Sequence, residues 1–242
     1  MPLECTMVCL DTSEHMRNGD FVPSRHESQQ DAANLVVGAK MQQNAENSVG
    51  VLTMASVGRK HSARVLVSPT DDMGKILASL SEARVSGTLN FVEGVQVAQL
   101  ALKHRRNKNG GQRIVLFVGS PLDTDEKALV KAGKVLKKNN IAVDVVQLGQ
   151  DEANVAKLRA FVDAVANHDN SNLVVVPAGV IPSDVLISSP VVQPEGSGGF
   201  SATPTSGGDE FPGVDASLDP ELALALRVSM EEERARQQAA AS

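Results

Sequence analysis

The feature that most constrains the fold of this chain is the alternation of short apolar runs with longer segments of helical periodicity. The clearest run, Arg-Ile-Val-Leu-Phe-Val at residues 113–118, has glycines before and after it. Near-continuous runs rich in β-branched residues are typical of strands that are buried on both faces of a parallel sheet. The runs predict strands at residues 5–10, 49–55, 64–68, 113–118, 141–148 and 173–176.

The segments between these runs repeat their apolar residues at helical spacing. They predict helices at residues 24–44, 72–83, 89–106, 124–138 and 152–166. Alternating strands and helices indicate an α/β fold, in which a doubly wound, mainly parallel sheet carries helices on both faces. A short polar loop between the second and third strands also allows a hairpin, so that one edge strand can run antiparallel.

Composition excludes several classes of function. A formal net charge of −6 argues against a general binder of polyanions, and the absence of Trp and Tyr leaves few rings on which bases could stack, so we expect no nucleic-acid partner. No apolar run is long enough to span a bilayer, and the amino end does not resemble a signal peptide. In a strand, Cys5, Met7 and Cys9 share one face, which predicts buried packing with free thiols in an intracellular, reducing compartment.

The character of the sequence changes near residue 188. Residues 189–216 are rich in Gly, Pro and Ser, which is the composition of a flexible linker. About 30 such residues have a root-mean-square reach of about 30 Å. We therefore predict a folded domain at residues 1–188, a linker at 189–216 and a separate terminal segment at 217–242.

The terminal segment predicts one short helix. Asp219 can cap it and Pro220 suits its first position. Within it, an arc of about 100° holds Leu222, Ala225, Leu226 and Ser229. An isolated helix of this length is marginal in water, so we expect it to fold on a partner. The alternative is an ordinary amphipathic helix that packs on its own domain.

The spacing Leu222-x-x-Ala225-x-x-x-Ser229-x-x-Glu232 resembles a ubiquitin-interacting motif. A small residue at 225 would let the helix backbone approach a shallow apolar groove, and a small hydroxyl at 229 would stay on the same face. Acidic residues on either side would meet basic residues around the apolar patch of ubiquitin. The resemblance implies ubiquitin contacts by Leu222, Ala223, Leu224, Ala225, Leu226, Ser229, Met230 and Glu232.

The first strand ends in Asp11-Thr-Ser13, which is similar to the first loop of a von Willebrand factor type A domain. Many members of that family hold Mg²⁺ or Mn²⁺ through Asp-x-Ser-x-Ser, a Thr on a second loop and an Asp on a third. Here His15 replaces the last Ser, Thr88 can stand for the Thr, and the third loop reads Gly119-Ser120-Pro121, with Asp123 two residues late. We therefore expect no metal, and interpret these residues as hydrogen-bonded loops and helix caps.

Taken together, the two halves closely resemble the family of ubiquitin-receptor subunits of the 26S proteasome regulatory particle. The resemblance implies a non-catalytic protein without a cofactor, present in the cytoplasm and the nucleus. Its type A domain would dock on lid and base subunits, with Asp11 at the docking site, and its helix would capture polyubiquitin. Animal members of the family carry a second motif, whereas this sequence shows one.

Two further hypotheses stay open at this point. One is a metal-dependent adhesion or ligand-binding type A domain, against which the missing acidic residue of the third loop counts. The other is a ubiquitin-binding type A adaptor in a nuclear repair or transcription complex. The basic run at residues 103–108 could be a nuclear-import or nucleic-acid patch, but we interpret it as charges that offset a helix dipole.

Overall fold

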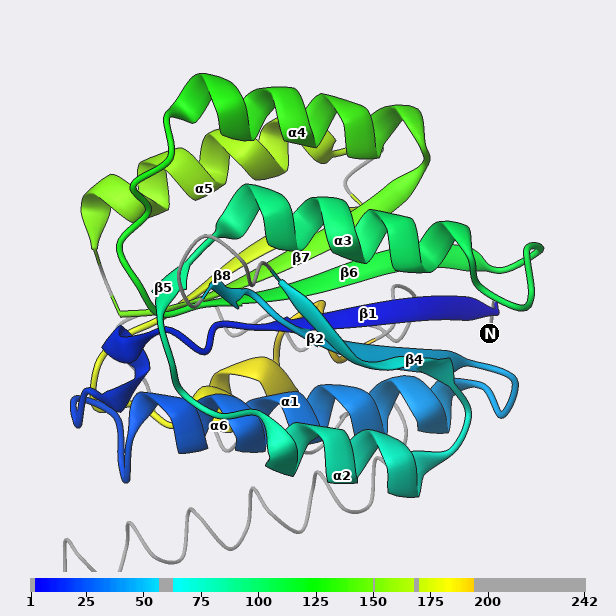
Figure 1. Ribbon diagram of the computed structural model, residues 1–242, viewed down its shortest axis with the longest axis horizontal. Helices are drawn as coiled ribbons and strands as arrows, with labels where there is room; N and C mark the ends of the chain where they lie inside the picture. Colours follow the sequence, from blue (N-terminus) through cyan, green and yellow to red (C-terminus); the bar gives the residue numbers. More distant parts are fainter. Residues whose placement is uncertain (1–2, 57–62, 150, 168–169, 194–242) are drawn as a thin grey trace, which may run out of the picture. The chain divides into compact units, whose positions relative to one another are not determined.

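A computed structural model describes residues 3–56, 63–149, 151–167 and 170–193 of the chain. Its main sheet has six strands in the order β4-β2-β1-β6-β7-β8 (Figure 1). β1 lies parallel to both β2 and β6, and β7 and β8 continue the parallel run, whereas β4 pairs antiparallel with β2 at one edge. The strands are β1 Glu4–Leu10, β2 Ser48–Thr53, β4 Arg64–Thr70, β6 Gly111–Val118, β7 Ile141–Leu148 and β8 Asn172–Val176.

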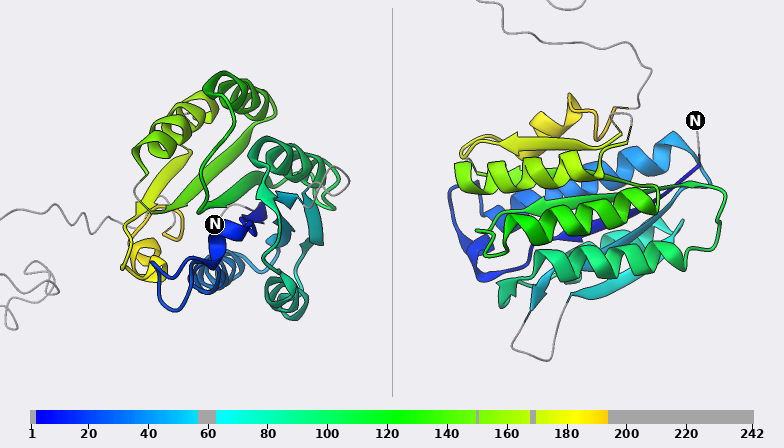
Figure 2. Two further views of the ribbon diagram at one scale, coloured as in Figure 1. Left: turned by 60° about the vertical axis from the view of Figure 1, so that its left-hand side comes forward. Right: turned by 90° about the horizontal axis from the view of Figure 1, so that it is seen from above.

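Helices cover both faces of this sheet, which confirms the predicted doubly wound α/β fold with one antiparallel edge strand (Figure 2). One face is covered by α3 Phe91–Lys103, α4 Glu126–Lys138 and α5 Glu152–Val165. The opposite face is covered by α1 Arg25–Gln43, α2 Met73–Glu82 and α6 Pro182–Ile187. Among the described residues, no helix combines the length and the apolar character that crossing a membrane requires.

Most predicted boundaries hold within two residues, and the largest difference concerns the helix predicted at 89–106, which ends at Lys103. The helix predicted from residue 89 begins at Phe91, because Leu89 belongs to the short strand β5 Thr88–Leu89. Asn90 then caps the helix by accepting a hydrogen bond of 3.3 Å from the N–H of Glu93. β5 pairs with β3 Ala55–Ser56, so the predicted strand 49–55 is in fact two strands, β2 and β3.

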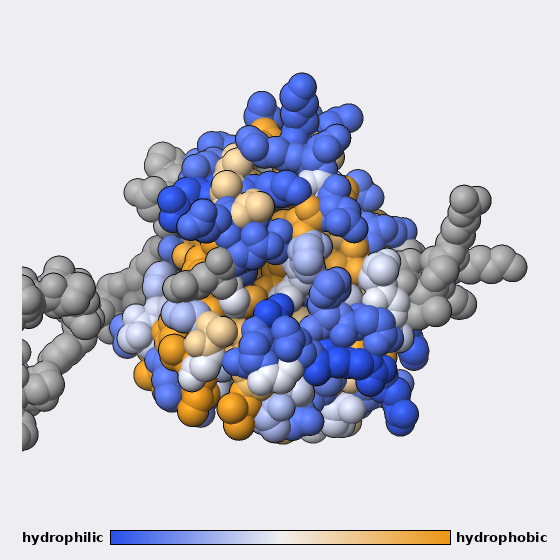
Figure 3. Space-filling model, turned by 90° about the vertical axis from the view of Figure 1, so that its left-hand side faces the viewer, coloured by the Kyte–Doolittle hydropathy of each residue, from blue (hydrophilic) through white to orange (hydrophobic). Residues whose placement is uncertain are grey.

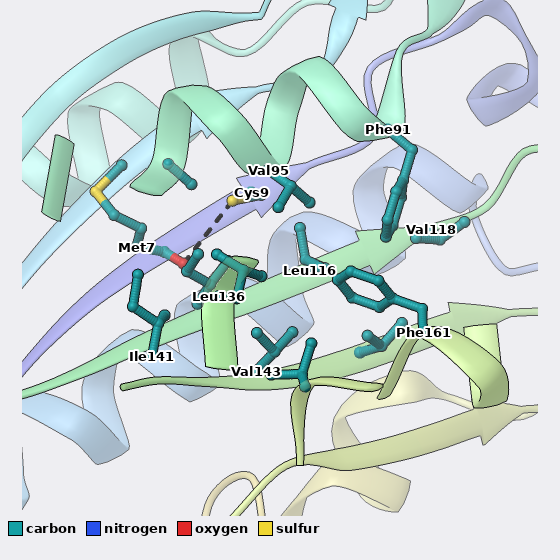
Figure 4. Packing of buried hydrophobic residues seen from close by; sticks show 14 of the residues in the cluster. Met7, Cys9, Phe91, Val95, Leu116, Val118, Leu136, Ile141, Val143 and Phe161 are labelled. Carbon is teal, nitrogen blue, oxygen red and sulfur yellow. Dashed lines mark hydrogen bonds between the residues drawn. The ribbon is translucent and has the colours of Figure 1, made fainter. Parts of the chain in front are cut away.

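The face under α3, α4 and α5 is packed around two aromatic rings (Figure 4). Phe91 of α3 and Phe161 of α5 meet edge to face, with ring centroids 5.2 Å apart. Cys5, Met7 and Cys9 all point into this cluster from β1, and both thiols are free and buried. The predicted face of buried cysteines is therefore confirmed.

Candidate functional site

The candidate site lies at the carboxyl edge of the sheet, between the central strands β1 and β6. The chain moves outward in one direction from β1 to β2 and in the other from β6 to β7 and β8, so the strand order reverses between β1 and β6. Ligands of open α/β sheets bind at such a switch point, outside the carboxyl ends of the strands. In this chain, the loops that begin at Asp11 and at Gly119 meet at this switch point.

Asp11 is fully buried at this point, and its carboxylate accepts three hydrogen bonds. The N–H of Ser13 donates to Oδ1 at 2.9 Å. Oδ2 accepts from the N–H of Gly119 at 3.0 Å and from the hydroxyl of Ser120 at 2.5 Å. Hydrogen bonds to a carboxylate are stronger than neutral ones, so this residue fastens the loop after β6 to the loop after β1.

The two serines form a directed chain with this carboxylate. The hydroxyl oxygens of Ser13 and Ser120 lie 2.5 Å apart, and both side chains are buried. Because a hydroxyl has one proton and Ser120 gives its proton to Asp11, Ser13 must be the donor to Ser120. We name Asp11, Ser13, Gly119 and Ser120 the Asp11 node.

An ion pair extends the node toward the surface. The Arg25 guanidinium donates to the carbonyl oxygen of Gly119 and forms a two-pronged pair with Asp20, at 2.6 and 2.5 Å. These hydrogen bonds from Arg25 hold the pKa of the Asp20 carboxyl below its usual range. Gly119 itself lies against Met16, which leaves no room for a Cβ atom.

Backbone hydrogen bonds tie further loops to the same edge. The N–H of Ser86 donates to the carbonyl of Thr12 at 2.7 Å, and that of Glu14 donates to Gly87 at 3.0 Å. On the other side, the N–H of Gly179 donates to the carbonyl of Asp20 at 3.1 Å. The loops after β1, α2, β6 and β8 therefore form one connected platform.

The oxygen atoms of the Asp11 node do not suit the ligation of a divalent cation. Both oxygens of Asp11 already accept N–H or O–H groups of the protein, and the third loop supplies the hydroxyl of Ser120 where a carboxylate would be needed. Asp123 and Thr88 are exposed rather than gathered at the node. The described residues contain no group of three acidic, His or Cys side chains that could hold a metal ion.

The platform also exposes apolar side chains. Val22 is 84% exposed and Ile181 is 58% exposed, and their loops are joined by the hydrogen bond from Gly179 to Asp20. Figure 3 views this end of the molecule and shows apolar surface among polar side chains. Exposed apolar patches with a polar surround mark contact surfaces in many proteins.

The structure thus gives Asp11 a specific kind of role. With no exposed surface of its own, Asp11 can influence a partner only by holding the surrounding loops in place. Sequence reasoning did not identify Ser120 as the partner of Asp11, although the short run Gly119-Ser120 directly after a strand was a usable signal, and it missed Arg25 and Asp20. The predicted ubiquitin-binding residues from Leu222 to Glu232, and the predicted domain bounds at 216 and 217, lie outside the described residues.

Comparison with known structures agrees with this architecture. A family model of the von Willebrand factor type A domain matches residues 6–121. The crystal structure of the SpRpn10 VWA domain is similar with a TM-score of 0.72 and 41% identity, and covers 78% of this chain and 96% of that one. A von Willebrand factor type A protein from Catenulispora acidiphila has a TM-score of 0.60 at 11% identity, over 79% of this chain and 43% of its own, which indicates the fold alone.

Curated relatives match the whole chain. The chain is 53% identical to the "26S proteasome non-ATPase regulatory subunit 4 homolog" of Arabidopsis thaliana, over 100% of this chain and 64% of the relative. It is 44% identical to the "26S proteasome regulatory subunit rpn10" of Schizosaccharomyces pombe, over 100% of this chain and 94% of the relative. The chain spans 64% and 61% of the length of the Arabidopsis and rice relatives that it matches.

Proposed function

The chain belongs to the family of 26S proteasome non-ATPase regulatory subunit 4, and from this premise we propose that it is a non-catalytic proteasome subunit that captures polyubiquitinated substrates. The observation that carries this proposal is 44% identity to a proteasome regulatory subunit across 94% of that subunit's length. The names of the relatives as regulatory, non-ATPase subunits support a role without catalysis.

Capture is assigned to the segment at residues 217–242. Its sequence places the small residues Ala225 and Ser229 side by side on an apolar arc that also includes Leu222 and Leu226. Small residues on such an arc favour close approach to a shallow apolar groove, which is the chemistry expected for a ubiquitin-interacting motif. Glu221 and Glu232 supply negative charge before and after the motif in the sequence.

Binding of one ubiquitin by this segment should be modest. One face of a short helix buries well under about 1,200 Å² in total, which is the size of weak and transient interfaces. A polyubiquitin chain offers several equivalent patches near the same tether, and this raises the effective concentration at each one. Weak single contacts also dissociate quickly. Fast dissociation is useful because a captured substrate must then be released for unfolding.

Docking is assigned to the type A domain. The Asp11 node supports this assignment because it orders four loops around an exposed apolar surface that includes Val22 and Ile181. A rigid platform of this kind loses little conformational entropy on association, which favours stable incorporation into a larger particle. We propose lid and base subunits of the regulatory particle as the partners.

The capture function is tested by a pull-down of tetraubiquitin of a single, defined linkage with the full chain. Ala225→Gln and Ser229→Phe each place a bulky side chain on the arc, and we expect retention of tetraubiquitin to fall at least tenfold. Ala240→Gln is the matched control, because it makes the same substitution outside the motif. Undiminished retention by Ala225→Gln would remove this segment from the proposal.

Assembly is tested separately by affinity purification of the tagged chain from cytosolic and nuclear extracts. We expect proteasome lid and base subunits to co-purify from both. Recovery with a nuclear repair or transcription complex, and without proteasome subunits, would favour the alternative of a ubiquitin-binding adaptor.

A further inference from the structure

A hollow lies at the amino edge of the sheet, at the opposite end of β6 and β7 from the Asp11 node. It has a volume of about 350 Å³ and lies between the last turns of α3 and α4. Figure 1 shows this end of α3 and the loop that leads into β6 on the right. The hollow is lined by the cationic side chains Lys103, Arg105 and Lys108, by the amides Gln99, Gln112 and Asn139, and by Ile141.

Among the described residues, the three cations have no acidic partner. No carboxylate lines the hollow, and within the described ranges neither Lys103 nor Lys108 makes a side-chain hydrogen bond or an ion pair. The Arg105 guanidinium donates to the carbonyls of Leu102 at 3.1 Å and Lys108 at 2.9 Å. Its buried Nε has no hydrogen-bond partner in the described part of the chain. A positive hollow is therefore kept in a chain whose net charge is −6.

Compensation of helix dipoles does not account for this much charge. The carboxyl ends of α3 and α4 each carry about half a negative charge. Three full positive charges exceed the sum of the two ends, so the hollow remains positive. The end of α4 beside the hollow strengthens this field, since its last turn carries Lys137 and Lys138 and no acidic residue.

The lining also indicates which anion fits. No aromatic ring lines the hollow, so a nucleobase would find no surface on which to stack. The carbonyls of Leu102 and Lys108 each take one N–H from a terminal nitrogen of Arg105, which fixes its guanidinium beside the hollow and leaves three of its five N–H groups without a carbonyl acceptor among the described residues. Lysine ammonium groups act as compact point charges that suit phosphate, and side-chain amides can donate to its oxygens.

We propose that this pocket binds a small, soluble anion that carries two or more phosphate groups. Lys103 and Lys108 supply the charge, and the amides of Gln99, Gln112 and Asn139 supply neutral donors. One N–H of Gln112 already donates to the carbonyl of Asn139 and one N–H of Asn139 to that of Val135, so each of these two amides offers its remaining N–H. The pocket and the Asp11 node lie at opposite edges of the sheet, so this inference does not depend on the proposed docking or capture functions.

The test is isothermal titration calorimetry of the full chain with sodium tripolyphosphate in 150 mM salt. We expect one site per chain, and at least a tenfold loss of affinity in the double variant Lys103→Gln/Lys108→Gln. Lys127→Gln/Lys131→Gln removes the same charge from the far half of α4, about 12 to 18 Å along the helix from Asn139. Affinity in this control should stay within twofold of the wild type. No binding by the wild type, or an equal loss in both double variants, would overturn the proposal.

Two further titrations distinguish phosphate chemistry from charge alone. Orthophosphate at matched ionic strength should bind at least tenfold more weakly than tripolyphosphate. Hexaglutamate should also bind at least tenfold more weakly, and equal affinity for it would overturn the phosphate assignment in favour of an acidic peptide. In NMR spectra, tripolyphosphate should shift the side-chain amide signals of Gln99, Gln112 and Asn139, a readout that needs no variant; unchanged signals would contradict the proposed pocket.

Discussion

The hydroxyl of Ser120 donates a hydrogen bond of 2.5 Å to the carboxylate of Asp11, and joins two loops that are 109 residues apart in the sequence. Both oxygens of Asp11 accept hydrogen bonds from these two loops, so protein donors hold the loops at the switch point together. Since the node is buried, its contribution to function is the shape of the platform above it.

The first prediction concerns the stability that the node provides. Asp11→Asn keeps the shape of the side chain but turns one acceptor into a donor, so that the N–H of Ser13 or of Gly119 is left facing an NH₂ group. An unsatisfied buried donor costs about 1–3 kcal/mol, and we expect the free energy of unfolding to fall by about that amount. Urea denaturation of the purified chain measures it.

The control for this experiment is Asp123→Asn, which makes the same chemical change at an exposed position. Its effect should stay within about 0.5 kcal/mol, as is usual for surface substitutions. If Asp11→Asn were as stable as Asp123→Asn, the hydrogen bonds of the node would contribute nothing to the folded state.

The second prediction concerns pH. Burial lowers the pKa of His26, and the hydrogen bond of its Nε2 to the carbonyl of Ala83, at 2.9 Å, offsets this only in part. With Nε2 as the donor to that carbonyl, the buried Nδ1 is left without a partner among the described residues, and protonating it would create a buried donor that has no acceptor. The neutral ring is therefore the form that the fold favours.

The sign of the pH effect follows from this pKa. The folded state has the lower pKa, so below the ordinary value of about 6.5 the unfolded chain binds more protons. His26 therefore contributes fully to the free energy of unfolding above its ordinary pKa. This contribution is lost as the pH falls from that value to the lower pKa of His26 in the folded state. Between pH 7.5 and 5.5 the wild type should lose more free energy of unfolding than His26→Gln, whose amide can still donate to Ala83. An equal loss in the two proteins would argue against a depressed pKa.

The third prediction concerns the thiols. Burial raises the pKa of both Cys5 and Cys9, and neither side chain is more than 3% exposed. Thiolates are the reactive species, so Ellman's reagent should label the native chain far more slowly than the urea-unfolded chain, in which both thiols react. Fast labelling of one thiol in the native state, assigned with Cys5→Ala, would show that the strand β1 opens locally.

The fold was predictable from the sequence because buried parallel strands and amphipathic helices leave strong periodic signals. The run at residues 113–118 identified β6, and Ser24 and Asp72 marked helix starts that the structure confirms as caps. The two-residue strands β3 and β5 were missed, since pairs such as Thr88–Leu89 are too short to show a period.

The candidate site was less predictable than the fold. Asp11 and Ser13 stood out because they follow a strand in a familiar pattern, whereas the run Gly119-Ser120 after another strand did not by itself identify Ser120 as their partner. Arg25, which pairs with Asp20, reaches the carbonyl of Gly119 only after the sheet has brought β1 and β6 together. Contacts of this kind depend on strand order, which local sequence patterns do not encode.

The central claim is that docking and capture belong to separate parts of the chain. The most direct measurement reconstitutes regulatory particles lacking this subunit with the wild type, Asp11→Arg or Ala225→Gln, and follows incorporation on native gels and retention of tetraubiquitin by the particles. We expect the Asp11→Arg chain to lose incorporation into the particles, although the free Asp11→Arg chain still binds tetraubiquitin. The Ala225→Gln chain should incorporate normally, but its particles should retain at least tenfold less tetraubiquitin than wild-type particles. Normal incorporation of Asp11→Arg together with full retention by Ala225→Gln particles would contradict the account.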